Sequence, residues 1–252
     1  MGKWFAGFLQ KQGFSVHALG RGGETTCQRL IERCQVVVVS VPIGVTCEVI
    51  ERVGPLVSTG SLMMDLTSLK AEPVECMLRC SVSEVIGVHP LFGPDVESMK
   101  GRNVVICPAR GGNWIAWLRQ LLTGSGAEVV ETTPDRHDRI MAMVQGLTHL
   151  TTVAMGLTVR ASGVDLSELR RFLTPTFEKK MAMIEKVFGD NQRLYAEIIA
   201  LNPDTQRLLC LYEEALHGLK GLLARRDSEA LLRLMQRAAP LPPCLEDRMI
   251  VG

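Results

Sequence analysis

Short apolar runs alternate with amphipathic segments over the first half of the chain. Nearly continuous Val, Ile, Leu and Met in three of the runs is typical of strands buried on both faces. Such an alternation predicts a doubly wound parallel sheet with helices on both faces. The runs that predict strands are FSVHAL (14–19), VVVVS (36–40), SLMMDL (61–66), EVIGV (84–88), NVVIC (103–107) and AEVVE (127–131). Helical periodicity lies near 2–12, 24–33, 44–54, 71–80 and 112–123.

The pattern changes after residue 133, where strand-like runs give way to helical spacing. Thr133 suits the cap of a helix whose first residue is Pro134, and apolar positions spaced by about 3.5 residues extend it to about Ala161. Further helices are expected at 165–188, with a capping box at Asp165-Leu-Ser-Glu168 and a break at Thr174-Pro175, and at 191–201, 204–225 and 228–238, before a surface tail. We therefore expect a dinucleotide-type α/β domain, 1–133, and an all-α domain, 134–252.

Composition narrows the class of protein. With 252 residues, 46% of them hydrophobic, the chain can form one large or two modest cores. A net charge of +1 and an aromatic content of 5% give no support to a nucleic-acid groove or a basic membrane-binding patch. The N-terminus lacks the apolar core of a signal peptide, and no run reaches about 18 apolar residues. We expect a cytoplasmic protein that acts on small molecules, without a nucleic-acid or membrane partner.

The eight cysteines carry no recognisable spacing. They are scattered along the chain without a CxxC pair, and no histidine stands at the spacing of a zinc finger. We interpret them as reduced thiols that fill the core of a cytoplasmic protein, and we predict no metal site.

The first helix begins at Gly2, which is unusual for this fold. In a dinucleotide-binding domain the first strand leads into a G-x-G-x-x-G loop, whose last glycine starts the next helix beside the pyrophosphate. Gly2 fits that last glycine, so the first strand and two glycines, about a dozen residues, are expected to be missing. The alternative is that Gly2 merely follows the initiator Met1. Loss of a central strand exposes unpaired backbone, so either the true start lies upstream or this chain binds nucleotide poorly.

The expected second strand ends at Gly20-Arg21. A domain that prefers NAD carries Asp or Glu at this place for the ribose hydroxyls, whereas an arginine can contact the 2′-phosphate of NADP. We therefore expect NADP as the cofactor, with NAD as the alternative. An ordinary surface arginine is the competing explanation of Arg21.

Four groups of small or polar side chains lie where such a fold binds ligands. Three of them follow strands, and the fourth recurs at every fourth position of the helix that begins at Pro134. The groups are Ser40, Val41 and Pro42; Asp65, Thr67, Ser68 and Lys70; His89 with Pro90; and His137, Met141, Gln145 and His149. The first group is expected to line the nicotinamide side. Taken singly, each residue also has a structural explanation as a turn, a cap or a buried polar group.

Taken together, six stretches resemble one family. The chain is similar to prephenate dehydrogenases, particularly archaeal prephenate/arogenate dehydrogenases, from residue 1 to about 203. The resemblance implies a nucleotide domain followed by a helical dimerisation domain, and hence a homodimer. It implies NAD(P)-dependent oxidative decarboxylation of prephenate to 4-hydroxyphenylpyruvate in tyrosine biosynthesis. The stretches are MGKWFAGFL, VVSVPI, MDLTSLK, GVHPLFGPD, HDRIMAMVQGLTH and LTPTFEKKMAMIEKVFGDNQRLYAEII.

The resemblance also implies roles for individual residues. His89 matches the base that takes the C4-hydroxyl proton, and Ser68 matches a serine that hydrogen-bonds the same hydroxyl. His149 and Gln145 match groups of the substrate pocket. Lys186 stands where the family commonly has an arginine for a substrate carboxylate, and lysine keeps the charge but loses the two-pronged fit. The alternatives for that role are Arg170, Arg171 and Lys179, with Lys186 then a solvated lysine.

Three rival interpretations remain. An arogenate dehydrogenase would use the same residues on a substrate with an amine in place of the keto group. A catalytically impaired homodimeric remnant would fold and associate without binding nucleotide. Another two-domain reductase, acting on a hydroxy acid or an imine, would share the nucleotide half but has no reason to carry GVHPLFGPD at this strand.

Overall fold

The computed structural model describes residues 1–20, 28–189 and 191–238. The chain divides into two compact units, Met1–Thr205 and Gln206–Gly252, and each is described by itself. The first unit contains the sheet and all the candidate site residues that are described. The expected tail, 240–252, the start of the expected helix 24–33 and Arg21 lie outside the described residues.

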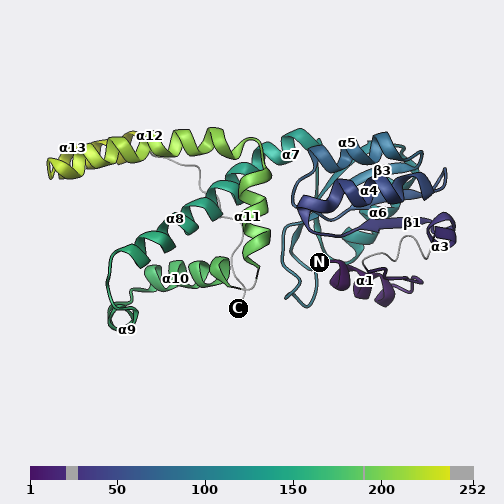
Figure 1. Ribbon diagram of the computed structural model, residues 1–252, viewed down its shortest axis with the longest axis horizontal. Coiled ribbons are helices and arrows are strands. Elements are labelled where there is room, and N and C mark those ends of the chain that lie inside the picture. Colours follow the sequence, from purple (N-terminus) through teal and green to yellow (C-terminus); the bar gives the residue numbers. More distant parts are fainter. Residues whose placement is uncertain (21–27, 190, 239–252) are drawn as a thin grey trace. The chain divides into compact units, whose positions relative to one another are not determined.

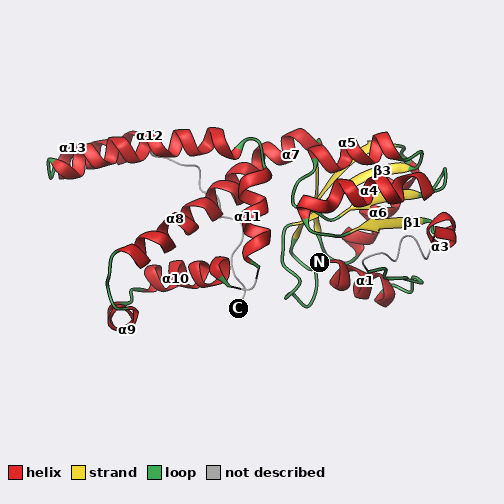
Figure 2. Ribbon diagram, in the orientation of Figure 1, coloured by secondary structure: helices red, strands yellow, loops and turns green. Residues whose placement is uncertain are grey.

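A five-stranded sheet forms the centre of the first unit (Figures 1 and 2). The strands follow one another across the sheet in chain order: β1 (Val36–Val39), β2 (Leu62–Asp65), β3 (Glu84–Pro90), β4 (Asn103–Arg110) and β5 (Glu128–Glu131). β1, β2 and β3 are mutually parallel, and β5 is parallel to β4. The predicted α/β class is confirmed, in the form of a mostly parallel sheet.

β4 departs from the expected parallel arrangement. It pairs with β3 in the antiparallel direction, with His89 opposite Val105. A parallel connection needs a crossover, usually a helix that packs on one face of the sheet. The residues from 91 to 102, all of them described, form turns and bends but no helix, so the chain returns beside β3 in the opposite direction.

Helices cover both faces of the sheet. α1 (Gly2–Lys11) and α6 (Asn113–Gly124) contribute to one hydrophobic core. α3 (Gln28–Arg33), α4 (Thr46–Val53) and α5 (Ala71–Cys80) contribute to the other. Short 3-10 turns, η1 (Ile43–Val45) and η2 (Gly54–Leu56), flank α4. The predicted doubly wound arrangement is therefore present around β1 to β5.

Successive side chains of a strand point to opposite faces of the sheet, which explains why there are two cores. Leu62 and Met64 of β2 enter the core beneath α1 and α6, whereas Met63 enters the core beneath α4 and α5. All three side chains are fully buried, and each such burial stabilises the fold by roughly 1.5–3 kcal/mol. A strand covered on both faces needs apolar residues at every position, which is the pattern that predicted it.

The strand predicted at FSVHAL (14–19) is wrong. Residues 14–20 form no strand in the described structure, and Phe14 and Leu19 are exposed. A strand forms only by pairing its backbone with a neighbour, and no described strand pairs with this segment. Val16 packs against the core beneath α1, and the Phe14 ring meets Trp117 edge to face.

The long helix predicted from Pro134 to Ala161 is confirmed, with an irregular centre. It consists of α7 (Pro134–Met141), a π-helical segment η3 (Ala142–Leu147) and α8 (Thr148–Ala161). The Thr133 hydroxyl caps it by accepting the Arg136 N–H at 3.3 Å. By length and composition alone this helix could span a membrane. In the described structure its first turns instead pack against α5 and β4 of the sheet domain.

The remaining helices also follow the sequence pattern. α9 (Leu166–Leu169) and the 3-10 turn η4 (Arg170–Phe172) precede α10 (Pro175–Phe188), and α11 (Gln192–Leu201) follows. The expected break lies at Thr174-Pro175, where the Thr174 hydroxyl accepts the Phe177 N–H at 3.2 Å. α12 (Thr205–Ala224) and α13 (Ser228–Ala238) form most of the described part of the second unit.

Gly87 of β3 provides a test of this packing. A Cβ there would lie 2.7 Å from Val74 Cγ2 and 3.0 Å from Lys70 Cδ, so Gly87→Ala is expected to lower the free energy of unfolding by about 1–3 kcal/mol. Urea unfolding followed by circular dichroism measures the change. Gly7→Ala in α1 is the matched control, because no described atom lies within 4 Å of the added Cβ, and it should stabilise by up to about 1 kcal/mol. Equal effects of the two substitutions would contradict the packing described.

Candidate active site

His89 lies at the carboxyl end of β3 and is 3% exposed. The strand alternation directs Val88 into the core beneath α1 and α6, so His89 lies on the opposite face, toward α5 and α7. Gly87 precedes it on the same face, and the absence of a side chain there leaves room for the buried Lys70 stem. Strand and helix together therefore place the imidazole at the edge where this fold binds ligands.

His89 is the end of a chain of hydrogen bonds. Its Nδ1 lies 2.9 Å from Nε2 of His137, and Nδ1 of His137 lies 2.7 Å from Oδ1 of Asp138. His137 and Asp138 are adjacent in α7, and both are buried. The N-terminal turn of α7 thus connects directly to β3.

Asp138 is held in place by the start of α5. Its Oδ1 accepts the Lys70 backbone N–H at 2.8 Å, and its Oδ2 accepts the Ala71 backbone N–H at 2.9 Å. The Asn202 side chain donates to the Asp138 carbonyl at 2.8 Å. Three N–H groups, counting that of His137, therefore converge on the carboxylate.

These hydrogen bonds determine which ring nitrogens of His137 and His89 carry hydrogen. The Asp138 carboxylate accepts a hydrogen bond from Nδ1–H of His137, so in this tautomer Nε2 of His137 carries no hydrogen. That nitrogen must then accept the Nδ1–H of His89. Nε2 of His89 is left with a free lone pair, which is the form required of a general base.

A buried ion pair lies beneath the imidazole. The Lys70 ammonium contacts the Asp65 carboxylate and donates to the Val88 carbonyl at 3.0 Å. Thr67 donates its backbone N–H to Asp65 at 2.9 Å and its hydroxyl to the Leu69 carbonyl at 2.8 Å. Lys70 and Asp65 are both fully buried, and the ammonium joins the end of β2, through the Asp65 carboxylate, to β3, through the Val88 carbonyl.

The surroundings keep His89 neutral. Burial lowers the pKa of His89 well below its ordinary value of about 6.5, and the nearby His137 and Lys70 lower the pKa further. At neutral pH the ring can therefore accept a proton.

A second group of polar side chains lies on and beside the π-helical segment. Oε1 of Gln145 and Nδ1 of His149 are buried without a hydrogen-bond partner among the described residues. The His149 ring meets Tyr195 of α11 edge to face, with centroids 4.8 Å apart. Burial lowers the pKa of His149, and the charge of Lys186 lowers it further. The structure thus brings three predicted substrate residues, Gln145, His149 and Lys186, into one region.

The residues expected at the nucleotide lie where β1 meets α1. A Cβ on Gly2 would lie 3.1 Å from both Cβ and Oγ of Ser40, so the start of α1 lies against the residue that follows β1. Val41 packs on the core beneath α4, and Pro42 precedes η1. In the described structure no side chain caps the first turn of α1, which leaves its N–H groups for another acceptor.

Ser68 lies half-buried between β2 and α5. It is flanked by Thr67, which contacts Asp65, and by Lys70, which contacts both Asp65 and Asp138. In the described part of the chain, the hydrogen-bond partner of His89 is His137 rather than Ser68. The role expected of Ser68 therefore stays a prediction.

Comparison with known proteins agrees with this arrangement. Residues 6–131 match the family model described as the nucleotide-binding domain of prephenate dehydrogenase, and residues 133–237 match the model of its dimerization domain. The chain belongs to the prephenate dehydrogenase family. The two matches place the His89 strand in the nucleotide-binding domain, and His137 with Asp138 in the dimerization domain.

Relatives with curated descriptions belong to the same family. The chain is 34% identical over 259 residues to a probable arogenate/prephenate dehydrogenase of Methanocaldococcus jannaschii, covering 95% of this chain and 58% of that protein. It is 34% identical over 220 residues to the T-protein of Haemophilus influenzae, covering 86% of this chain and 58% of that protein. The chain thus spans less than two thirds of the length of these relatives.

Solved structures show the same fold. Arogenate dehydrogenase from Synechocystis matches with a TM-score of 0.70 and 20% identity, over 94% of this chain and 93% of that chain. Prephenate dehydrogenase from A. aeolicus, in complex with hydroxyphenyl propionate and NAD+, matches with a TM-score of 0.72 and 17% identity, over 94% and 92%. These likenesses show the fold, and the family model assigns residues 6–131 to a nucleotide-binding domain.

Sequence reasoning missed the role of Asp138 and left His137 as one polar residue of a helical stripe. A charged residue on an amphipathic helix ordinarily faces solvent, so the sequence offered little signal for Asp138. Asp65 and Lys70 are among the predicted residues at the end of β2 and after it, but the sequence analysis does not predict their ion pair, although a carboxylate at the end of a buried strand needs a partner. Tyr195 was also missed, since only the fold brings α11 beside His149.

The lowered pKa of His89 predicts a pH dependence of stability. Below about pH 6.5 the unfolded chain binds a proton at this histidine while the folded chain does not, so the free energy of unfolding should fall as the pH drops from 6.5 toward 5. The contribution of one histidine reaches about 1.4 kcal/mol per pH unit. Urea unfolding of the parent and of His89→Asn across this range measures it. The free energy of unfolding should depend less steeply on pH in the variant than in the parent. Equal pH dependences would contradict a buried, neutral His89.

Proposed function

We propose that this chain catalyses NAD(P)-dependent oxidative decarboxylation of prephenate to 4-hydroxyphenylpyruvate, a step of tyrosine biosynthesis. The observation that carries the proposal is the chain from Asp138 through His137 to His89, which leaves Nε2 of His89 as a proton acceptor. Family membership supplies the reaction class. Arogenate is the alternative substrate, because the named relatives include both prephenate and arogenate dehydrogenases.

The residues at the start of α1 fit a dinucleotide. The uncapped N-terminal turn of α1 offers backbone N–H groups and the positive end of a helix dipole to a pyrophosphate. Gly2 allows close approach, because any side chain there would press on Ser40. Ser40, Val41 and Pro42 would line the nicotinamide side. The bound nicotinamide supplies the acceptor for the hydride that leaves C4 of the substrate ring.

His89 then acts on the substrate hydroxyl. As hydride departs from C4, the hydroxyl on that carbon becomes acidic, and Nε2 of His89 takes its proton. His137 and the Asp138 carboxylate hold the ring orientation and stabilise the imidazolium that forms. Ser68 hydrogen-bonds the same hydroxyl and positions it. Loss of the ring carboxylate as CO2 makes the ring aromatic, which drives the reaction.

The polar groups around the π-helical segment would hold the rest of the substrate. His149 and Gln145 have buried polar atoms without partners in the described structure, and a ligand can satisfy them. Lys186, close enough to affect His149, supplies positive charge for a carboxylate. A lysine makes one flexible contact where an arginine would make two, so we propose weaker recognition of the carboxylate than a guanidinium would give.

The proposed organisation follows from the same residues. Residues 1–133 would form the dinucleotide-binding domain, and 134–252 the helical domain for substrate and dimerisation. Exposed apolar side chains of the helical part, such as Leu157, Leu166 and Phe172, support burial against a second copy in a homodimer. Six cysteines of the described residues are free thiols, which agrees with a cytoplasmic location.

Replacement of the base tests the mechanism. His89→Asn keeps a polar side chain but removes the proton acceptor, so kcat with prephenate is expected to fall by about 10²–10⁴-fold. The measurement is the near-ultraviolet absorbance of reduced nicotinamide, with NAD+ and NADP+ tested separately. The dinucleotide affinity, measured by fluorescence titration, should change little.

His217→Asn is the matched control, because His217 is exposed on α12 and lies outside the proposed site. It should keep the parent rate. Undiminished turnover by His89→Asn would overturn the mechanism. A parent chain that is silent on prephenate and arogenate with both nucleotides would overturn the proposed activity and support the impaired remnant.

The proposed preference for NADP rests on Arg21 at the end of the segment FSVHALGR. An arginine at this place neutralises the 2′-phosphate of NADP, whereas an acidic residue repels that phosphate and accepts from the ribose hydroxyls of NAD. Arg21→Asp is therefore expected to lower kcat/KM for NADP+ by at least about tenfold relative to that for NAD+. Steady-state rates with the two nucleotides measure the ratio. An unchanged ratio would make Arg21 an ordinary surface residue.

A further inference from the structure

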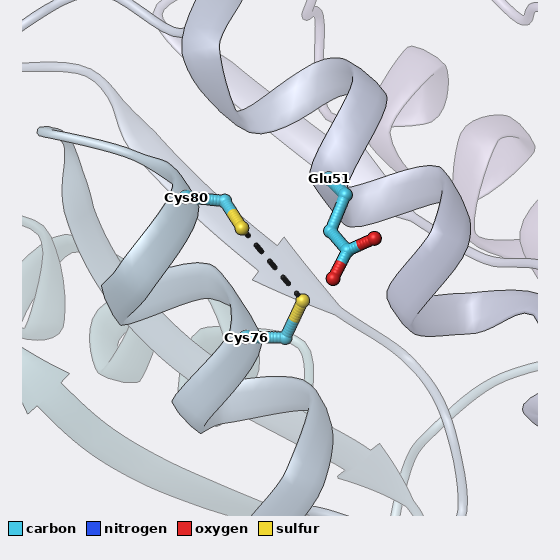
Figure 3. A group of neighbouring side chains, drawn as sticks. All are labelled: Glu51, Cys76 and Cys80. Carbon is cyan, nitrogen blue, oxygen red and sulfur yellow. Dashed lines mark hydrogen bonds between the residues drawn. The ribbon is translucent and has the colours of Figure 1, made fainter.

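Three cysteines that are scattered in the sequence lie together between α4 and α5. The Sγ atoms of Cys76 and Cys80 are 4.0 Å apart, and the Cys76 thiol donates to the Cys47 carbonyl at 3.6 Å. Glu51 of α4 directs its carboxylate toward Cys76 (Figure 3). The donor atoms of Glu51, Cys76 and Cys80 all lie within 4.8 Å of one another. Sequence spacing concealed the cluster, because its members come from two helices.

We propose that Glu51, Cys76 and Cys80 form a site for a thiophilic divalent cation of the zinc class, with water as the fourth ligand. Two thiolates and a carboxylate are donors that zinc accepts readily, and a water molecule completes a tetrahedral set. Cys76 and Cys80 are one helical turn apart on α5 and so point to the same side. Glu51 and Cys47 occupy one turn of α4 in the same way.

The spacing of the sulfur atoms matches a shared metal ion. Zinc–sulfur bonds of about 2.3 Å in a tetrahedron place two sulfur atoms about 3.8 Å apart. The observed 4.0 Å between Cys76 and Cys80 differs little from that edge. A disulfide requires about 2.05 Å, so the two sulfur atoms would have to halve their separation. The spacing is therefore compatible with coordination of one ion by both sulfur atoms.

A cationic group already bridges the same atoms. Arg79 donates to the Glu51 carboxylate at 3.2 Å and to Sγ of Cys76 at 3.7 Å. The guanidinium thus lies where positive charge is favourable between a carboxylate and a sulfur. Its side chain is 60% exposed, so it can turn into solvent when a metal ion takes its place. Arg79 and the metal ion are competitors for one site.

The site would have a structural role. It lies toward the C-terminal end of α5, and about 15 Å of helix separates Cys80 from Lys70, the residue that precedes the first turn. A bound ion would join α4 to α5. The amino ends of these helices carry Pro42 and Lys70 into the candidate active site, so the ion would steady the scaffold of that site without contacting substrate.

Titration of the reduced, metal-free chain with Co2+ tests the proposal. Thiolate–Co2+ charge-transfer absorbance should rise until one equivalent of Co2+ per chain has been added. It should vanish when Zn2+ is added in competition. Saturating Zn2+ should raise the Tm by on the order of 5 °C. Cys76→Ser and Cys80→Ser should each weaken Co2+ binding by more than about 100-fold, because each removes a direct ligand.

Substitutions at two exposed residues are expected to shift the affinity for Co2+ in opposite directions. Glu51→Gln should weaken Co2+ binding by about tenfold or more, because a neutral amide is a poor ligand. Arg79→Met should strengthen it, because the competing guanidinium is gone. Cys34→Ser, at a half-buried thiol outside the cluster, is the matched control and should bind Co2+ as the parent does.

Two results would overturn the site: no thiolate–Co2+ absorbance in the parent, or full absorbance in the Cys76→Ser/Cys80→Ser double variant. If circular dichroism shows that the cysteine variants fail to fold, the Glu51 and Arg79 variants decide the matter. Opposite shifts in affinity support the site, and the absence of a shift in both overturns it. These readouts are independent of the proposed activity on prephenate.

Discussion

The Asp138 carboxylate accepts the backbone N–H groups of Lys70 and Ala71, and this contact orients the rest of the candidate site. It fixes the start of α7 against the start of α5, and thereby fixes His137. His137 in turn determines which nitrogen of His89 carries the proton. A single carboxylate thus links the family's nucleotide-binding domain to the first turn of the dimerization domain. The chemistry of the imidazole depends on that junction more than on its own strand.

Burial of the Lys70–Asp65 pair carries a large desolvation cost. Removing both charges from water costs several kcal/mol per ion, and their attraction with the added hydrogen bonds must offset that cost. An apolar pair of similar volume would stabilise the fold as well or better. The ammonium, however, helps to lower the pKa of His89, and the Lys70 backbone holds Asp138. The ion pair is therefore better explained by the function proposed for His89 than by stability.

α5 connects two proposed functions of the molecule. Its amino end contacts Asp138 and carries Lys70, while its carboxyl end carries Cys76 and Cys80 beside Glu51 of α4. A helix is stiff along its axis, so a restraint at one end limits movement at the other. The π-helical segment acts differently. It offers the buried Oε1 of Gln145, which has no partner in the described structure, and such irregular turns are frequent at binding sites.

The sequence by itself determined the local elements of this protein. Caps such as Thr133 and Thr174 and the apolar periodicity act within a few residues, so the helices and the buried strands could be predicted, as could His89 at a strand end. Only the tertiary structure decided the antiparallel direction of β4, the absence of a strand at FSVHAL, the pairing of His89 with His137 and the meeting of the thiols. Each of these depends on residues distant in the chain, whose approach is set by packing and backbone pairing that no local pattern encodes.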